Sequence, residues 1–367
     1  MNQEPLKTSE QKKSCSNCGA ELKYKPGTST ITCEYCNHEE SITASKNAFE
    51  ELKLKPYLDK MGGQSHTEKI SMLLCKTCGA NQHVEDNYKS LHCVYCSQPL
   101  IVEDAHLEDW ILPGAVLPFQ LTRQQSHQIF KEWVKGLWFA PNKLKRAALD
   151  PEKTKGLYMP YWTFDAELQG EYTGQRGDYY YVTESYTTTV NGKNVRRTRQ
   201  VRKTRWSYAS GNIQGFIDDT LICASEQKSN TIPEKITQWN LEQLESFNSS
   251  YLAGFVTEKY TLSLEDGHLK SNQKAREIAT TWAKHDIGGD TQRISSLNMQ
   301  LSKETFKHIL LPVYISSYVY NNKKYHFYVN GQTGKISGDR PYSFWKIFFL
   351  VLAIATTVAC IILFQNQ

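Results

Sequence analysis

The sequence lacks the motifs by which nucleotide-dependent enzymes and hydrolases bind and attack their substrates. Its 367 residues contain no Gly-Lys-Ser or Gly-Lys-Thr, and the glycine-rich stretch 330–338 places Ile336 after Gly334 and Lys335, unlike a phosphate-binding loop. Histidines are scattered singly, without a Ser/His/Asp order. Adjacent carboxylates such as Asp218 and Asp219 diverge on a strand or a helix, which makes them poor acid–base pairs. The sequence therefore predicts no enzyme and no catalytic residue.

A strong net charge is also absent. The formal charge of +5 is small for this length, so any affinity for nucleic acid or membranes must come from a local patch. The start of the sequence has no secretory-signal pattern, so we expect its ten cysteines to lie in a reducing compartment, where disulfides are rare. The length allows two or three domains with a sizeable core.

Eight of the cysteines form two copies of one pattern, C-x2-C-x14-C-x2-C, and the second copy follows the first by sixty residues at every position. Two thiolates three residues apart can hold one side of a tetrahedral ion, and a second such turn supplies the other two ligands. The spacing predicts two zinc ribbons at residues 15–40 and 71–100. The predicted ligands are Cys15, Cys18, Cys33 and Cys36 in the first and Cys75, Cys78, Cys93 and Cys96 in the second.

The predicted cofactor is Zn²⁺, with two ions per chain in structural sites, because four thiolates leave no open coordination position for catalysis. An iron centre of the rubredoxin type uses the same four ligands and remains an alternative. A disulfide framework is disfavoured by the expected reducing compartment. Because the ribbons are small, we expect their folding free energy to come largely from the metal.

The C-terminal segment 347–364 contains eighteen uncharged, mostly apolar residues. As a helix it would be about 27 Å long, close to the thickness of the hydrocarbon core of a bilayer. Tyr342 and Trp345 stand where an interfacial aromatic belt is expected, and a buried core helix would seldom be apolar on every side. The sequence predicts one transmembrane helix at 343–364. Lys335, Arg340 and Lys346 precede it, so we expect a single-pass cell-membrane protein with its N-terminal domains in the cytoplasm.

The remaining residues predict an α+β fold with mainly antiparallel pairing over 101–340. Residues 1–14 are expected to be disordered, and 41–70 to be a linker whose stretch 44–60, a weak helix, lets the ribbons move separately. Helices are expected after Thr122, near 234–247 and near 272–285, from apolar residues at helical spacing. Strands are expected at 157–164 and 309–315, with a hairpin from 314 to 329.

Asn191-Gly192 is a strong signal for a two-residue hairpin turn. Pairing about it places Val182 opposite Val201, Glu184 opposite Arg199 and Asp178 opposite Arg205. Both faces of this hairpin are polar, so we expect it to project from the fold. Its second strand carries cations without an acidic residue, at Lys193, Arg196, Arg197, Arg199, Arg202, Lys203 and Arg205. The hairpin either binds an anionic partner or is an edge protected by charge from aggregation.

The cysteine repeats and four further segments resemble a family of bacterial membrane proteins with two zinc ribbons of the transcription-factor-IIB type. These segments are WILPGAVLPF at 110–119, KGLWFAP at 135–141, GLYMPYW at 156–162 and YVNGQTGK at 328–335. Members are often labelled as phage replication or primosomal helicase-like proteins, a label that the missing nucleotide-binding loop contradicts here. The resemblance implies partners of the flotillin-like (SPFH-domain) or phage-shock-protein-A-like kind, in envelope-stress assemblies.

Two functions are compatible with these features. The first is a non-enzymatic, tail-anchored adaptor that recruits partner proteins to the cytoplasmic face of the membrane. The second is a zinc-ribbon protein of replication or transcription that binds nucleic acid through the ribbons and the basic hairpin. The first ribbon holds Lys23 and Lys25 against Glu21 and Glu34, and this balance disfavours contact with a phosphate backbone.

Overall fold

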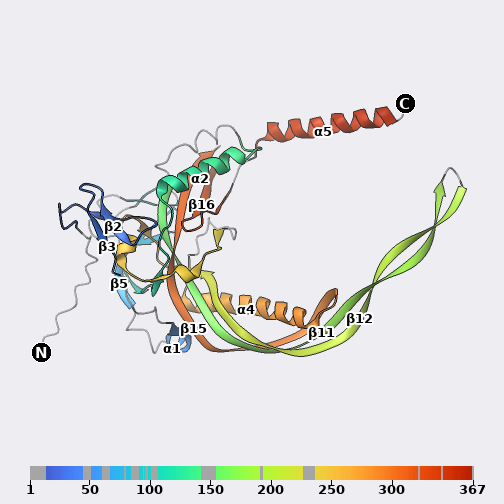
Figure 1. Cartoon of the computed structure of the whole chain (residues 1–367), viewed down its shortest axis with the longest axis horizontal. Helices are drawn as coiled ribbons and strands as arrows, with labels where there is room; N and C mark the ends of the chain where they lie inside the picture. The colour runs from blue at the N-terminus through green and yellow to red at the C-terminus, as the bar shows by residue number, and fades with distance from the viewer. Residues whose placement is uncertain are drawn as a thin grey trace.

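The computed structural model describes residues 14–43, 51–59, 67–77, 80–83, 91–93, 95, 98–100, 106–141, 154–190, 193–225, 236–320, 323–339 and 342–365. The fold is a mixture of helices and largely antiparallel sheets, as the sequence predicts. Figure 1 shows a body from which a long curved ribbon of strands and the C-terminal helix extend. Residues 1–13, which belong to the segment expected to be disordered, lie outside the described residues.

The body is organised around one large sheet. Its long strands are β11 (Thr154–Val190), β12 (Lys193–Cys223) and β15 (Thr291–Tyr320), and its short strands are β4 (Leu52–Lys53), β10 (Ala115–Val116), β13 (Glu245–Ser246), β14 (Val256–Thr257), β16 (Lys323–Asn330) and β17 (Ile336–Gly338). The central order is β12-β11-β15-β10-β13. Most pairs are antiparallel, while β10 runs parallel to β15 and β14 runs parallel to β11. The predicted strands 157–164 and 309–315 are the buried parts of β11 and β15.

Beyond the body, β12, β11 and β15 continue as a three-stranded ribbon. The third strand ends where Thr291 pairs with Gly177, and β11 and β12 then continue alone as a two-stranded hairpin. We call residues 178–205 the arm. Its register is the predicted one, with Val182 opposite Val201 and Asp178 opposite Arg205. At about 3.3 Å per residue, the arm extends about 40 Å beyond the third strand.

Helix α4 (Leu264–Ile287) lies along one face of the ribbon (Figure 1). Its buried positions recur every four residues and are mostly small, including Gly267, Ala275 and Ala279, so the helix packs close to the strands. Gly215 of β12 makes room for the ring of Trp282, because a Cβ there would lie 2.6 Å from that ring. The helix predicted near 272–285 is thus confirmed as part of a longer one.

Helix α2 (Arg123–Gly136) begins after Thr122, as predicted. The side chain of Thr122 accepts a hydrogen bond from the Gln125 N–H, and the Gln125 side chain accepts one from the Thr122 N–H. This reciprocal arrangement satisfies two backbone donors at the helix start. Phe130 and Val134 then pack against Phe327 of β16, which fixes α2 on the body.

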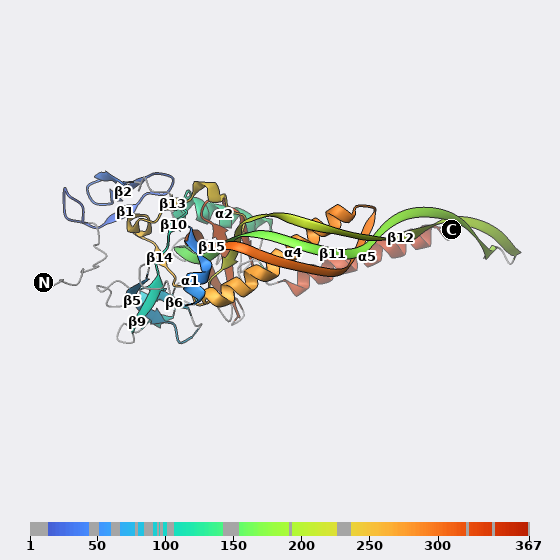
Figure 2. The ribbon, with the colours of Figure 1, turned by 90° about the horizontal axis from the view of Figure 1, so that it is seen from below.

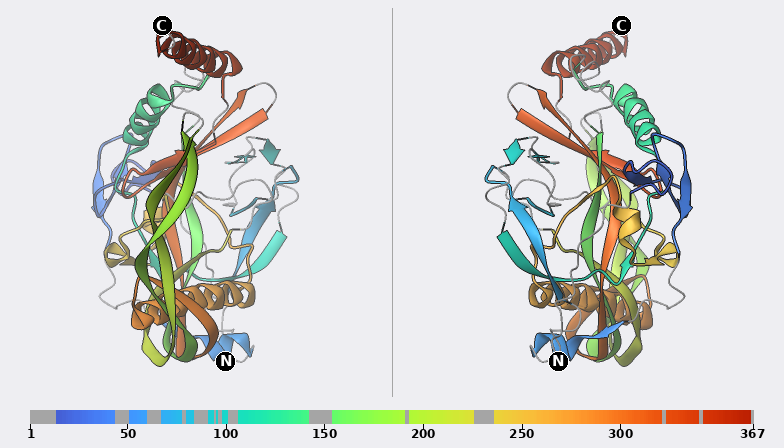
Figure 3. Two further views of the ribbon diagram at one scale, coloured as in Figure 1. Left: turned by 90° about the vertical axis from the view of Figure 1, so that its right-hand side faces the viewer. Right: turned by 90° about the vertical axis from the view of Figure 1, so that its left-hand side faces the viewer.

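The two cysteine repeats pack against opposite faces of the central sheet. The first contains β1 (Leu22–Tyr24), β2 (Thr30–Cys33) and β3 (Glu39–Ser41); the second contains β6 (Asn81–His83), β7 (Leu91–His92) and β8 (Pro99–Leu100), with β5 (Thr67–Leu74) and β9 (His106–Ile111) beside it. Tyr158 and Leu310 share a core with the first repeat, while Leu157 and Ile309 share one with the second. Successive strand residues point to opposite faces, so the sheet lies between the repeats, as Figures 2 and 3 show.

Two expectations about local structure are wrong. Within the stretch 44–60, part of the predicted weak helix is present as the short helix α1 (Leu54–Leu58), which follows β4, but the segment is not the free spacer that was predicted, because Leu54 is buried against Trp162 and Phe306. This contact ties the segment to the body. Among the described residues 236–247, the predicted helix is instead a single 3-10 turn, η4 (Leu241–Gln243), followed by β13.

The physical reason for the second error lies in the side chains around η4. The Asn240 side chain accepts a hydrogen bond from the Glu242 N–H, and Gln332 bonds both the N–H and the carbonyl of Asn240. These contacts replace the hydrogen bonds that would continue a helix. A second 3-10 turn, η5 (Ser249–Leu252), follows and contacts β1.

Candidate functional site

The first cysteine repeat forms two tight turns whose backbones hold the thiols together. The N–H of Cys15 donates to the Ala20 carbonyl, and the N–H of Cys33 donates to the His38 carbonyl. Each turn then needs a positive φ after its second cysteine, which Gly19 supplies at 75° and Asn37 at 60°. The four cysteines Cys15, Cys18, Cys33 and Cys36 thereby come together, with every pair of sulfur atoms within 4.8 Å.

The spacing of these sulfurs fits a tetrahedral metal site. The Sγ atoms of Cys15 and Cys36 are 3.5 Å apart, and those of Cys18 and Cys33 are 3.4 Å apart. A tetrahedral ion with Zn–S bonds near 2.3 Å separates its ligands by about 3.8 Å. The observed separations exceed a disulfide bond by more than 1 Å. The cluster can therefore hold a zinc ion after a small outward movement of the thiols.

The backbone favours the thiolate form, which a metal requires, at one of the four sulfurs, Cys36; at Cys18 the Ala20 backbone hydrogen bond also lowers the pKa, but the Cys36 and Cys33 thiols outweigh it and raise that pKa. A hydrogen bond from the His38 backbone lowers the pKa of Cys36 to about 6. Metals bind the thiolate, so a site that already stabilises the ionised sulfur loses less free energy on deprotonation.

The second repeat reproduces the first over its described residues. The N–H of Cys75 donates to the Ala80 carbonyl and the N–H of Cys93 to the Gln98 carbonyl, each sixty residues after its counterpart. The pairing of His92 with Pro99 likewise repeats that of Thr32 with Glu39. Cys75 and Cys93 are buried in one core, whereas Cys78 and Cys96, the other two predicted ligands, lie outside the described residues.

The repeats differ in how their second turns meet the body. Tyr95, between the last two cysteines of the second repeat, is buried, and its hydroxyl donates to Glu258 Oε2 at 2.5 Å. Ser225 donates to the other oxygen of the same carboxyl at 2.7 Å. Burial, with the charge of Glu258, raises the pKa of Tyr95, so the tyrosine keeps its proton and remains a donor. Its counterpart Tyr35 in the first repeat is 89% exposed.

The first repeat is instead attached through its strands. The Tyr24 N–H donates to the Ala253 carbonyl, and the Gly27 N–H donates to the Phe119 carbonyl. The Tyr24 ring is buried edge-on against Tyr251. The second turn of the first repeat therefore faces solvent while the strands behind it are fixed.

The arm brings the predicted cations together along one strand. Arg196, Arg197, Arg199, Arg202, Lys203 and Arg205 are all exposed. Glu184 on the opposite strand pairs with Lys203 at 3.0 Å and Arg199 at 3.6 Å, and these charges lower its pKa. Guanidinium groups also lie over tyrosine rings, with Arg202 4.2 Å from the ring centre of Tyr179. The arm is thus a cationic surface interleaved with aromatic rings, and it projects as predicted (Figure 1).

The C-terminal helix α5 (Phe344–Gln365) is apolar and exposed. An 18-residue window within Phe344–Phe364 has a mean hydropathy of 2.9, and none of that window is buried in the fold. The hydroxyls of Thr356 and Thr357 both donate to the Ala353 carbonyl, so the helix satisfies them internally. The helix is long and apolar enough to span a membrane.

Comparisons with known proteins identify one similar chain. No family model matches the sequence, and no solved structure matches it. The chain is similar to the uncharacterized protein YdjG of Bacillus subtilis (strain 168). The two are 24% identical over 345 residues, which cover 91% of each chain.

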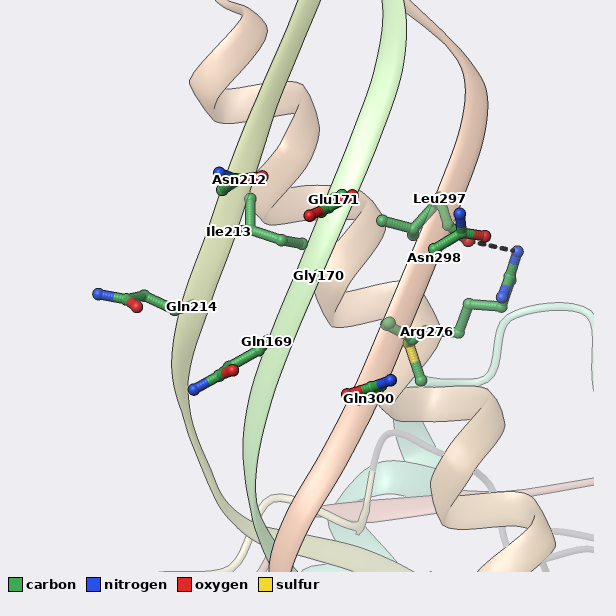
Figure 4. A pocket seen from close by; sticks show the side chains of 11 residues that line it. Gln169, Gly170, Glu171, Asn212, Ile213, Gln214, Arg276, Leu297, Asn298 and Gln300 are labelled. Atoms are coloured by element: carbon green, nitrogen blue, oxygen red, sulfur yellow. Dashed lines mark hydrogen bonds between the residues drawn. The ribbon is translucent and has the colours of Figure 1, made fainter.

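The three-stranded ribbon also carries a shallow hollow of about 680 Å³ (Figure 4). Cross-strand rows of amides line it: Gln169 pairs with Gln214 and Gln300, and Glu171 pairs with Asn212 and Asn298. Arg276 of α4 reaches its edge and donates to the Leu297 carbonyl. The lining supplies hydrogen-bonding groups but neither a thiol nor an imidazole, so it suggests no particular chemistry.

A cluster of charged side chains at the root of the ribbon was missed from the sequence. Asp165, Asp218 and Asp219 bring their carboxylates within 4.8 Å of one another, although adjacent aspartates were expected to diverge. The reason is the irregularity in strand pairing after Phe164, together with a positive φ of 46° at Asp219. No signal in the sequence identifies this irregularity.

The cation of this cluster is the side chain of Lys307. Its Nζ lies 3.0 Å from Asp219, 3.1 Å from Glu51 and 3.8 Å from Asp165. Burial alone would lower the pKa of Lys307, but the Asp219 hydrogen bond and the Asp165 charge outweigh it and raise that pKa. Burial raises the pKa of Asp165 to about 6. We call this cluster the charged joint, because its ion pairs lie where the three-stranded ribbon leaves the body.

Proposed function

We propose that this chain is a non-enzymatic, tail-anchored membrane adaptor with two structural zinc ribbons. Helix α5 anchors the chain as a single membrane span. The two zinc ribbons, the body and the arm lie on the cytoplasmic face of the membrane, where they recruit partner proteins. The observation that carries the proposal is the exposed apolar helix α5, because an unburied apolar helix of this length matches the hydrocarbon core of a bilayer.

The positions of the repeats support a scaffolding role. Because each repeat packs on one face of the central sheet, a metal ion in each repeat would stiffen the part of the body against which that repeat packs. A rigid surface loses little conformational entropy on binding a partner. The second turn of the first repeat, with exposed Tyr35, and the cationic arm are the surfaces that remain available.

The arm supports nucleic-acid binding as a second candidate function. Exposed guanidinium groups interleaved with tyrosines are also suited to phosphates and stacked bases. In the adaptor proposal the same surface contacts an acidic protein partner. The flotillin-like and phage-shock-protein-A-like proteins implied by the family resemblance are the partners to test first.

An affinity capture of the detergent-extracted full chain tests the proposal. The wild type is compared with a variant in which Arg196, Arg197, Arg199 and Arg202 are glutamine, after nuclease treatment and over a range of salt. We expect specific proteins to bind the wild type in nuclease-treated extracts. Co-purification of nucleic acid with a steep salt dependence, without specific proteins, would refute the adaptor function in favour of the second candidate.

A further inference from the structure

The turn that follows α2 holds two aromatic side chains outside the fold. Leu137 and Ala140 at its ends are buried against Phe130 and Phe327, which fixes the turn. Between them, Trp138 is 83% exposed and Phe139 is 37% exposed. Tryptophan is usually among the most buried side chains on average, so such exposure on a fixed turn needs an explanation.

The same turn is bonded to the start of α5. The N–H of Ser343, the residue before the helix, donates to the Phe139 carbonyl at 2.7 Å. Lys346 Nζ donates to the Ala140 carbonyl at 2.8 Å and to the Trp138 carbonyl at 3.3 Å. The ammonium thus bonds two carbonyls of the turn, although it belongs to the first turn of α5.

Exposed aromatic residues gather where these two segments meet. Tyr342, Phe344 and Trp345 are 58%, 72% and 65% exposed, and they join Trp138 and Phe139. Tryptophan and tyrosine collect at the boundary between lipid headgroups and acyl chains, because their rings are apolar while their N–H and O–H groups bond to water and headgroups. The aromatic belt of α5 therefore continues onto the turn.

We propose that the turn 137–141 inserts into the interfacial layer of the bilayer that α5 spans, with Trp138 and Phe139 among the phospholipid headgroups and upper acyl chains. The inference rests on the proposed membrane span. It gives the body a second lipid contact beside α5, so the body has a fixed orientation on the membrane.

The direction of α5 relative to the arm does not alter this conclusion. Figures 1 and 2 show α5 and the arm leaving the body in the same direction. The arm cations stay out of the hydrocarbon core, where a charged side chain is costly, so α5 must rotate relative to the arm when it enters a bilayer. Ser343 precedes α5, so a rotation at the first turn of the helix leaves its bond to Phe139 outside the part that moves, whereas the Lys346 contacts then have to change.

Quenching of tryptophan emission by brominated lipid tests the inference in the full chain. The protein is placed in nanodiscs of phosphatidylcholine and phosphatidylglycerol, with or without bromine on the upper acyl chain. Trp345→Phe removes the signal expected from α5, and the double variant Trp345→Phe/Trp138→Phe also removes that of the turn. Trp345→Phe/Trp206→Phe is the matched control, because Trp206 lies at the root of the arm under Arg293.

We expect the emission of wild type to be quenched most and that of Trp345→Phe to keep a clear quenched fraction. The double variant Trp345→Phe/Trp138→Phe should lose this fraction, whereas the control Trp345→Phe/Trp206→Phe should keep it. If Trp345→Phe and the Trp138 double variant are quenched equally while wild type is quenched more, α5 spans the membrane but the turn lies outside it or under protein. If wild type is not quenched, the membrane span and the inference both fail.

Discussion

Replacing Tyr95 by phenylalanine tests the contact between the second repeat and the body. The substitution removes one hydroxyl and leaves the ring in place. In the folded chain that hydroxyl donates to Glu258, whose side chain is fully buried. The loss of one donor leaves the carboxyl with the Ser225 hydrogen bond on its other oxygen.

The magnitude follows from the kind of hydrogen bond that is lost. A hydrogen bond contributes about 0.5–1.5 kcal/mol when both groups are neutral and about 1.5–3 kcal/mol when one is charged, and removing one partner of a buried group costs about 1–3 kcal/mol. We therefore expect Tyr95→Phe to lower the free energy of unfolding by about 1–3 kcal/mol. Urea denaturation of the full chain in nanodiscs, followed by tryptophan fluorescence, measures the change.

The internal repeat supplies the matched control. Tyr35 occupies the equivalent position sixty residues earlier and is 89% exposed, so Tyr35→Phe should change the unfolding free energy by less than about 0.5 kcal/mol. Equal effects of the two substitutions would show that Tyr95 does not bind the body through its hydroxyl, and would refute the reasoning.

Three further predictions concern the metal, the charged joint and the segment before the second repeat. Cys33→Ser should remove one zinc ion per chain by elemental analysis, whereas Cys360→Ser in α5 should leave the zinc content unchanged. Burial raises the pKa of Asp165 to about 6, so the folded chain binds this proton more tightly than the unfolded chain does. The free energy of unfolding of wild type, minus that of Asp165→Asn, should therefore fall as the pH rises from about 4 to about 6. A flat or rising difference in urea titrations would contradict this. Leu54→Ala should cost about 2–5 kcal/mol in the same titrations, since Leu54 is 1% exposed, and a cost below about 1 kcal/mol would mean that residues 51–59 do not contact the body.

Local features could be predicted from the sequence where neighbouring residues alone determine them. The turn at Asn191-Gly192 sets the register of the whole arm, and the pairing of Glu184 with Arg199 followed from it. Thr122 with Gln125 fixed the start of α2 in the same way. The first cysteine cluster also followed from spacing, because two short turns bring four thiols together wherever they stand in the chain.

Features that depend on distant contacts could not be predicted. The segment near 234–247 has apolar residues at helical spacing, but Gln332, some ninety residues away, bonds the backbone N–H and carbonyl of Asn240, just before η4 begins, and these groups are then not available to an α-helix. The charged joint needs Lys307 beside Asp165 across a strand irregularity that no residue type signals. The packing of the repeats on both faces of the sheet likewise depends on the alternation along β11, where Leu157 and Tyr158 each contact a different repeat.

Native mass spectrometry of the full chain, released from nanodiscs in the gas phase, tests the central claim most directly. The account predicts a mass increase of two zinc ions per chain, lost one ion at a time as chelator is added, with the eight repeat cysteines protected from alkylation until then. A chain that carries iron, or one that carries no metal and has its repeat cysteines oxidised to disulfides, would contradict it.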